Sequence, residues 1–313
     1  MNLPDYAPVP RSAFGPAVNE QGYYVGLIER NLYWITDGDY QSAFLATRDG
    51  VVLFDAPASI GHNIRRAVDE VTRAIGTPSQ ITHLVYTHHH SDHAGGSSIF
   101  GKDIARIGHE ETRRLLLRDN DPKKPAPEET FQDRRMIEIG GERFELSWHG
   151  GNHTPDNSFI HFPDHNALML VDINMPGWVP FYGINISEDI PGYITAPDIA
   201  FEYEWTTMIT GHLGRLGTRE DLGIHQRYIA DIVDEAKSSL AELDPTPYFA
   251  KYGENIWAGV KEWLYAVSEI AATRVAGKYV DVLGAADVFT FSNTMAILES
   301  MRLDLGYRMD VHP

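Results

Sequence analysis

Cysteine is absent from the 313 residues of this chain. Its absence excludes disulfide bonds, thiolate ligands for metals and cysteine nucleophiles. Any metal ion bound by the chain would therefore be held by nitrogen and oxygen atoms alone.

Positive charge is scarce as well. The chain has 26 lysine and arginine residues against 44 aspartate and glutamate residues, which gives a formal net charge of -18. The pair Lys123 and Lys124 lies in a short, mixed segment, "RDNDPKK", and no longer basic run offers a groove for a phosphate backbone. We therefore expect a small-molecule substrate and no nucleic-acid partner.

Long hydrophobic runs are missing too. No segment approaches the roughly eighteen uninterrupted apolar residues of a transmembrane helix. The amino-terminal stretch "MNLPDYAPVPRSAFGPAVNEQG" lacks the basic start and apolar run of an export signal. We expect a cytoplasmic protein that does not bind membranes, and its 43% hydrophobic content is enough to bury a core.

Strand and helix patterns alternate in the first part of the chain. Residues 23–57 contain several short β-rich runs separated by turn signals, which predicts a meander of strands. Ile64, Val68, Val71 and Ile75 recur at helical spacing, and "GTP" from Gly76 ends the helix. A buried strand, "ITHLVYT", follows, so the pattern predicts an α/β fold.

Helical patterns dominate after residue 225. Two apolar stripes at helical spacing, one over residues 228–240 and one over 256–271, are separated by a hinge at Leu243–Pro247. We predict a catalytic domain over residues 1–240 and a helical extension over 241–313 that packs on it. Trp257 and Trp263 are expected to pack in its core or at a subunit interface, and a homodimer remains open.

The segment "YTHHHSDHAGG" stands at the end of the buried strand. A tight loop there can direct His88 and His90 to one metal ion, and Asp92 and His93 to a neighbouring one. His89 is then a spacer whose side chain points away. One loop would thus supply about half of the ligands of two ions.

Three further loops offer the remaining ligands. His153 lies in "GGNHTPDNS", Asp172 ends the apolar strand "LMLVD", and His212 lies in "MITGHLG". Each residue follows a predicted strand or turn, as the histidine loop does. Their context favours a metal site over a set of unrelated histidines.

These segments, together with "LFDAP", resemble the metallo-β-lactamase-fold hydrolase superfamily over about residues 24–218. The resemblance implies an αβ/βα sandwich with two metal ions at the rim between two β-sheets. It assigns His88, His90 and His153 to one ion, Asp92, His93 and His212 to the other, and Asp172 as the bridge. Asp55 in "LFDAP" would accept a hydrogen bond that orients a ligand imidazole; the alternative is a turn residue that closes the strand.

Two divalent ions in such a site lower the pKa of a shared water and give hydroxide near neutral pH. The expected reaction is hydrolysis of a carboxylic ester, lactone or amide, β-lactams included, with Asp92 and Asp172 as catalytic residues that orient the water and move its proton. Zinc suits these donors best, and iron, manganese or cobalt also suit them.

The subfamily is left open by the residues. Asp172 stands where B1 β-lactamases have cysteine, and their substrate-anchoring lysine is missing. Asp156-Asn157 replaces the Gly-His of glyoxalase II, and Met175 replaces a tyrosine of the lactonases. A thioesterase of glyoxalase II type, a mononuclear iron persulfide dioxygenase and an inactive regulatory copy of the fold remain alternatives.

An aromatic segment, "PGWVPFYGINI", follows Asp172. Trp178, Phe181 and Tyr182 are candidates for an apolar wall of the substrate pocket. The competing interpretation is that they pack in a core against the helical extension.

Overall fold

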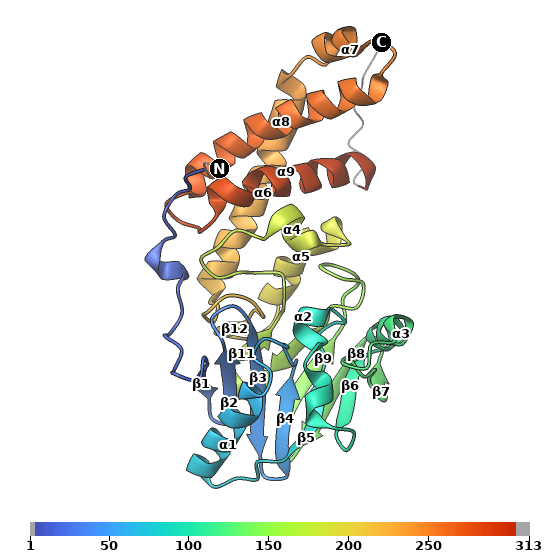
Figure 1. Ribbon diagram of the computed structural model, residues 1–313. Coiled ribbons are helices and arrows are strands. Elements are labelled where there is room, and N and C mark those ends of the chain that lie inside the picture. Colours follow the sequence, from blue (N-terminus) through green and yellow to red (C-terminus); the bar gives the residue numbers. More distant parts are fainter. Residues whose placement is uncertain (1–3, 305–313) are drawn as a thin grey trace.

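The computed structural model describes residues 4–304, in which two β-sheets pack face to face (Figure 1). The first sheet has seven strands in chain order: β1 (Tyr24–Glu29), β2 (Leu32–Thr36), β3 (Gln41–Thr47), β4 (Gly50–Phe54), β5 (Ile81–Val85), β6 (Ala105–His109) and β7 (Glu129–Phe131). The second has five, in the order β12 (Thr207–Ile209), β11 (Ala167–Met169), β10 (Phe159–Phe162), β9 (Glu142–Ser147) and β8 (Arg134–Ile139).

Strand direction differs between the two ends of the first sheet. Strands β1 to β4 pair antiparallel, which confirms the predicted meander, and β4 to β7 pair parallel. Every residue of β3 and β4 is buried, because the second sheet covers one face and helices cover the other. Phe54, Phe144 and Phe162 form part of the core between the sheets.

Helix α1 (Asn63–Ile75) covers the outer face of the first sheet. Its Ile64, Val68 and Val71 pack with Phe44 of β3. The helix ends where Gly76 adopts a left-handed conformation with φ of 75°, which glycine accepts without strain. The same half of the chain contains α2 (Ser91–Ala94), α3 (Glu110–Asp119) and the short 3-10 turns η1 (Arg11–Ala13) and η2 (Ser97–Phe100). A third 3-10 turn, η3 (Pro163–His165), joins β10 to β11 of the second sheet.

The second sheet is covered by α5 (Ile190–Phe201) and α6 (Arg219–Glu242), and the short α4 (Tyr182–Ile186) precedes them. Thr218 begins α6 with a reciprocal capping box to Asp221. Phe159 and Met208 of the sheet share one apolar cluster with Tyr193 of α5. That cluster continues without interruption into the helices that follow.

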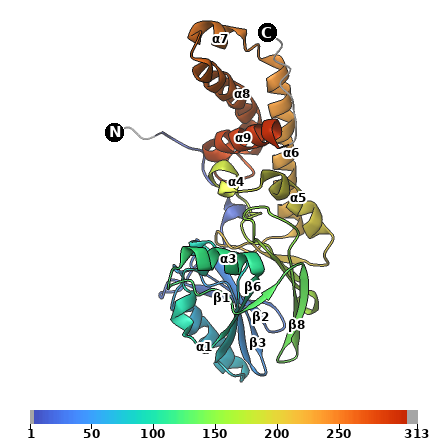
Figure 2. The same cartoon turned by 90° about the vertical axis from the view of Figure 1, so that its right-hand side faces the viewer.

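The last helices are α7 (Thr246–Tyr252), α8 (Ile256–Tyr279) and α9 (Ala286–Leu303). These helices extend from one end of the sandwich, and α4 and α5 lie between them and the two sheets (Figures 1 and 2). Trp263 of α8 is buried in the cluster shared with the second sheet, whereas Trp257 is 82% exposed. Within residues 4–304, no helix has the length and apolarity to cross a membrane.

The predicted α/β sandwich with a carboxy-terminal helical extension is confirmed. The predicted hinge, Leu243–Pro247, follows α6 and overlaps the first two residues of α7. The division into domains at residues 240 and 241 stays a prediction, and residues 305–313 of the predicted extension lie outside the described residues.

Candidate metal centre

Seven histidine and aspartate side chains meet at one edge of the sandwich. The histidine loop, residues 88–93, follows β5; His153 lies between β9 and β10; Asp172 and His212 follow the parallel neighbours β11 and β12. Loops at the ends of neighbouring strands gather at the same sheet edge. The fold thus brings together all seven residues that the sequence proposed as ligands.

One group consists of His88, His90, His153 and Asp172, whose ligand-type atoms all lie within 4.8 Å of one another. Nε2 of His153 lies 3.1 Å from Nδ1 of His90. Oδ2 of Asp172 lies 3.1 Å from Nε2 of His153 and 3.3 Å from Nε2 of His88. The group has the donors for one ion.

The second group consists of Asp92, His93 and His212, within the same 4.8 Å limit. The Nε2 atoms of His93 and His212 are 3.1 Å apart. Oδ2 of Asp92 lies 3.4 Å from Nε2 of His212 and 3.7 Å from Nε2 of His93. These residues are the ones that the sequence proposed for the second ion.

Asp172 lies between the two groups. Its Oδ2 is 3.3 Å from Nε2 of His88 and 3.3 Å from Nε2 of His93, and its Oδ1 is 2.9 Å from Nε2 of His212. Its side chain is only 3% exposed. A carboxylate in this position can be shared by two ions.

The donor atoms fit divalent ions better than they fit one another. The ring nitrogens of His90 and His153, and those of His93 and His212, face each other at 3.1 Å, and each pair can share a hydrogen bond only where one of the two nitrogens carries hydrogen. Nε2 of His88 is buried without a hydrogen-bond partner, an arrangement that costs free energy unless a ligand satisfies it. Imidazole and carboxylate donors of this kind suit zinc and related ions; their role as ligands stays a prediction.

Burial keeps His88 and His90 uncharged. It lowers the pKa of His88 to about 4 and that of His90 to about 3, so both are neutral near pH 7, the form that binds metals. Burial opposes protonation of His212 too, but the carboxylates of Asp172 and Asp92 outweigh it and raise its pKa to about 10. Burial would also raise the pKa of Asp92, yet its contacts with His212 and His93 hold that pKa well below its usual range.

Asp55 supports the centre through Thr87. It is fully buried after β4 and accepts hydrogen bonds from the Thr87 backbone N–H at 2.8 Å and hydroxyl at 2.6 Å. Because that hydroxyl donates to Asp55, it accepts from Nδ1 of His88, 3.1 Å away, and the His88 Nε2 lone pair then faces the cluster. The sequence predicted an acceptor for a ligand imidazole; Asp55 reaches His88 through Thr87, and its Oδ2 lies 4.0 Å from Nδ1 of His93.

The backbone beside the donors is unusual. Asp172 has a φ of 64°, a left-handed conformation that costs a non-glycine residue free energy. Its carbonyl accepts a hydrogen bond of 2.8 Å from Nδ2 of Asn185. Gly211 has a φ of 84°, and a Cβ there would lie 2.5 Å from Val171 and 2.9 Å from the His93 ring, so the approach to His212 requires glycine.

His89 belongs to neither of the two donor groups around Asp172, although it forms a further set of possible ligands with His90 and Glu188. Its Nδ1 lies 2.9 Å from Oδ1 of Asp156, and both side chains are buried. That His89 points away from the ions stays a prediction. The sequence did not reveal that Asp156, in "NHTPDNS", is its partner.

A cavity of 670 Å³ opens beside the donors. Trp178 and Phe181, two of the three proposed wall residues, line it; Tyr182 is 60% exposed and is not among the residues that line it. Sequence reasoning missed Ile186 and Phe289, because Phe289 lies on α9, far along the chain, and no local pattern marks it.

Tyr40 is a second residue that the sequence did not mark. It lines the cavity, and its ring centroid lies 4.7 Å from that of His212. Burial, followed by the nearby carboxylates of Asp92 and Asp172, raises its pKa, so the phenol stays protonated near neutral pH. Tyr40 can therefore donate a hydrogen bond into the cavity.

The segment α4 forms part of the cavity wall in a left-handed conformation. Gly183, Ile184, Asn185 and Ile186 have φ values of 60°, 58°, 56° and 55°. Such a run is costly for β-branched residues and persists only where its surroundings hold it. Asn293 of α9 holds it, because its Oδ1 accepts from the Ile184 N–H at 2.8 Å and its Nδ2 donates to the Pro180 carbonyl at 2.9 Å.

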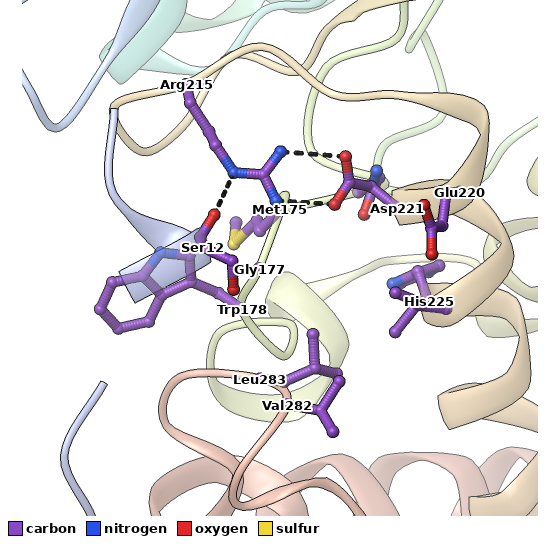
Figure 3. A pocket seen from close by; sticks show the side chains of 12 residues that line it. Ser12, Met175, Gly177, Trp178, Arg215, Glu220, Asp221, His225, Val282 and Leu283 are labelled. Carbon is purple, nitrogen blue, oxygen red and sulfur yellow. Dashed lines mark hydrogen bonds and ion pairs between the residues drawn. The ribbon is translucent and has the colours of Figure 1, made fainter. Parts of the chain in front are cut away.

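A neighbouring cavity of 290 Å³ shares Met175 and Trp178 with the first (Figure 3). At its edge Arg215 joins the Ser12 carbonyl to the Asp221 carboxylate, and His225 of α6 lies on another side. His225 is buried with neither ring nitrogen hydrogen bonded. None of the metal-binding groups found among the described residues includes His225.

Comparison with known families agrees with this geometry. The family model of the metallo-beta-lactamase superfamily matches residues 36–173, a range that contains every proposed ligand except His212. The metallo-beta-lactamase from Pontibacter korlensis shares the fold, with a TM-score of 0.56 at 19% identity over 66% of this chain and 97% of that chain.

Curated relatives match less of their own length. The chain is 28% identical over 218 residues to 2,4-dinitroanisole O-demethylase subunit alpha from Nocardioides sp. (strain JS1661), which is 68% of this chain and 63% of that protein. It is 32% identical over 128 residues to metallo-beta-lactamase IND-1 from Chryseobacterium indologenes, which is 41% of this chain and 51% of that protein. The chain thus spans between about half and 63% of these relatives.

Proposed function

We propose that this chain, which belongs to the metallo-β-lactamase superfamily, is a dinuclear metal-dependent hydrolase that cleaves a carboxylic ester, lactone or amide bond of a small molecule. One observation carries the proposal. The Asp172 carboxylate lies within 3.3 Å of imidazole nitrogens from both donor groups, beside a cavity large enough for a small substrate.

The two groups divide the proposed ligands between two ions. His88, His90 and His153 would hold the first, Asp92, His93 and His212 the second, and Asp172 both. Bound there, divalent ions would lower the pKa of a coordinated water and polarise a carbonyl group. Zinc suits the donors best, and iron or manganese could take the same positions.

The protein side chains would position the attacking water and transfer its proton. Asp92 has the more accessible carboxylate, with 39% of its side chain exposed against 3% for Asp172, so Asp92 can accept the proton of the attacking water. The water oxygen bonds to the carbonyl carbon, the bond from that carbon to the leaving oxygen or nitrogen breaks, and the leaving atom takes a proton. Tyr40 can donate a hydrogen bond to the developing oxyanion.

An aryl ether is a second candidate substrate. The relative whose name describes an O-demethylase aligns over 218 residues, against 128 for the β-lactamase IND-1. The same nucleophile could attack an activated aromatic carbon that carries a methoxy group, with loss of methoxide, which takes a proton and leaves as methanol. This reaction needs the same ligands and no additional cofactor.

A substrate panel tests the proposal. Metal-loaded protein would be assayed with lactones, thioesters, β-lactams, aryl esters and activated aryl methyl ethers, and compared with His88→Ala and with His62→Ala, which changes an exposed histidine outside the site. We expect hydrolysis that His88→Ala abolishes and His62→Ala preserves. Turnover that survives His88→Ala would contradict the assigned site.

The alternatives predict different results in this panel, or in measurements of iron content and oxygen uptake with a persulfide. A thioesterase of glyoxalase II type would be favoured by turnover of thioesters alone. A persulfide dioxygenase would contain one iron and consume oxygen with a persulfide. A regulatory copy of the fold would hydrolyse none of the compounds.

A further inference from the structure

The helical extension supplies part of the cavity beside the proposed metal ligands, through Phe289 and Ala285. We infer that this wall selects the substrate, and that the site accepts an uncharged molecule whose aryl group packs against Phe181 and Phe289. The inference rests on the proposed hydrolase function. It adds the substrate class and the residues that determine it.

Aromatic rings line the side of the cavity away from the sheets. The rings of Phe181 and Phe289 are 5.0 Å apart at an interplanar angle of 63° in an edge-to-face contact, and Trp178 lines the same cavity. Phe181 is nevertheless 48% exposed and Ile186 63% exposed. Apolar surface left open inside a concave site is the kind of surface that a ligand covers, and aryl groups pack well edge-to-face on such rings.

The charged residues of the cavity disfavour an acidic group on the part of the substrate that lies against the aromatic wall. None of the described residues that line it is lysine or arginine, whereas Asp92, Asp172 and Glu188 are acidic. A carboxylate placed against Phe181 and Phe289, away from His212 and the proposed ions, would lose its hydration without a lysine or arginine to pair with. The pocket therefore favours an uncharged substrate over one with a free carboxylate.

The wall is fixed to the catalytic sandwich by backbone hydrogen bonds. Gly284, two residues before α9, donates to the Gly177 carbonyl at 2.8 Å and accepts from the Val179 N–H at 3.1 Å. The Asn293 side chain holds the left-handed turn from the other side. Phe289 thus has a defined place, and changing it should change specificity more than folding.

Two matched aryl acetates test the charge preference. Methyl 4-acetoxybenzoate is uncharged, and 4-acetoxybenzoate differs from it by a free carboxylate; ethyl acetate serves as a small aliphatic ester. We expect kcat/KM, corrected for alkaline hydrolysis, to be at least about tenfold higher for the uncharged aryl ester. Equal values, or a preference for the carboxylate, would overturn the inference.

Variants of α9 test the wall. Phe289→Ala should lower kcat/KM for the uncharged aryl ester by about tenfold and change that for ethyl acetate by less than about twofold. Phe291→Ala is the matched control, because Phe291 lies on the same helix, packs against Tyr265 and does not line the cavity. Phe289→Leu removes the ring but keeps most of the buried volume, so it replaces Phe289→Ala if that variant does not fold. We expect the same loss of kcat/KM for the aryl ester.

The outcomes distinguish failure of the hydrolase function from failure of the aromatic wall. Wild-type protein that hydrolyses neither the three esters nor any compound of the substrate panel, or turnover that survives His88→Ala, would contradict the hydrolase and with it the inference. Hydrolysis of panel compounds but of neither aryl acetate would overturn the inference alone. Turnover that depends on His88 but falls equally for aryl and aliphatic esters in both Phe289 variants would leave the hydrolase standing and overturn the aromatic wall.

Discussion

Oδ1 of Asp172 lies 2.9 Å from Nε2 of His212, although the two residues belong to different loops. The contact exists because β11 and β12 are parallel neighbours that end at the same edge of the second sheet. Parallel pairing therefore places Asp172, the proposed shared ligand, beside His212, a proposed ligand of the second ion. The arrangement explains how a metal centre can depend on the whole sandwich rather than on the histidine loop alone.

Tyr40→Phe tests the role of a hydroxyl beside the donors. If the phenol donates to the developing oxyanion, its loss should lower kcat by roughly 10–100-fold and change KM little. The pKa of Tyr40 is raised, so wild-type kcat should show no loss from phenol ionisation between pH 7 and its usual pKa of about 10. Steady-state kinetics would measure this. A kcat within about twofold of wild type would remove Tyr40 from the mechanism.

Thr87→Val tests the relay from Asp55 to His88. Valine keeps the shape of threonine but cannot accept from Nδ1 of His88 or donate to Asp55. We expect the affinity for zinc to fall by roughly 10–100-fold, as measured by competition with a chelator. Thr82→Val is the control, because the Thr82 hydroxyl lies next to His83, which is not a proposed ligand. Equal affinities in the two variants would argue against the relay.

Asn293→Ala tests the support of the left-handed turn. The amide is fully buried and bonds Ile184, Pro180 and Tyr228, so its loss should lower the free energy of unfolding by about 1–3 kcal/mol. It should also lower activity, because the turn places Asn185 on the Asp172 carbonyl. Urea denaturation and ester hydrolysis would measure both effects.

Asn255→Ala provides the comparison for Asn293→Ala. Asn255 caps α8 and does not line the cavity, so this variant should lose some stability and keep its activity. If both variants lose the same fraction of activity, the turn has no specific role.

The sequence predicted the seven donor residues because their spacing and their positions after strands carry chemical information. It could not predict Tyr40, Phe289 or Asn293, since their roles arise from tertiary packing and each is an ordinary residue in its local pattern. The role predicted for Asp55 stays a prediction, and the relay through Thr87 could not be foreseen because it depends on side-chain geometry. Tyr182 shows the converse, because an aromatic neighbour of two wall residues lies 60% exposed outside the cavity lining.

His225 should make stability depend on pH. Burial lowers its pKa to about 4, below the value of about 6.5 in an unfolded chain, so the unfolded chain takes up a proton more readily. As far as His225 is concerned, the folded state therefore keeps its full stability above about pH 6.5. As the pH falls towards 4, the buried neutral His225 lowers the free energy of unfolding by about 3 kcal/mol in total. His225→Phe should remove this pH dependence. Urea unfolding of both proteins at pH 7.5 and 4.5 is the measurement, and identical pH dependence in the two would contradict the assignment.

The metal content of the purified chain tests the central claim most directly. Protein loaded with zinc, dialysed and analysed by inductively coupled plasma mass spectrometry should contain about two equivalents per chain, because the other six donors form two groups around Asp172. Asp172→Asn should retain fewer, since the shared carboxylate is lost. Wild-type protein that holds well under one equivalent of zinc, and takes up no manganese or iron in its place, would contradict the account.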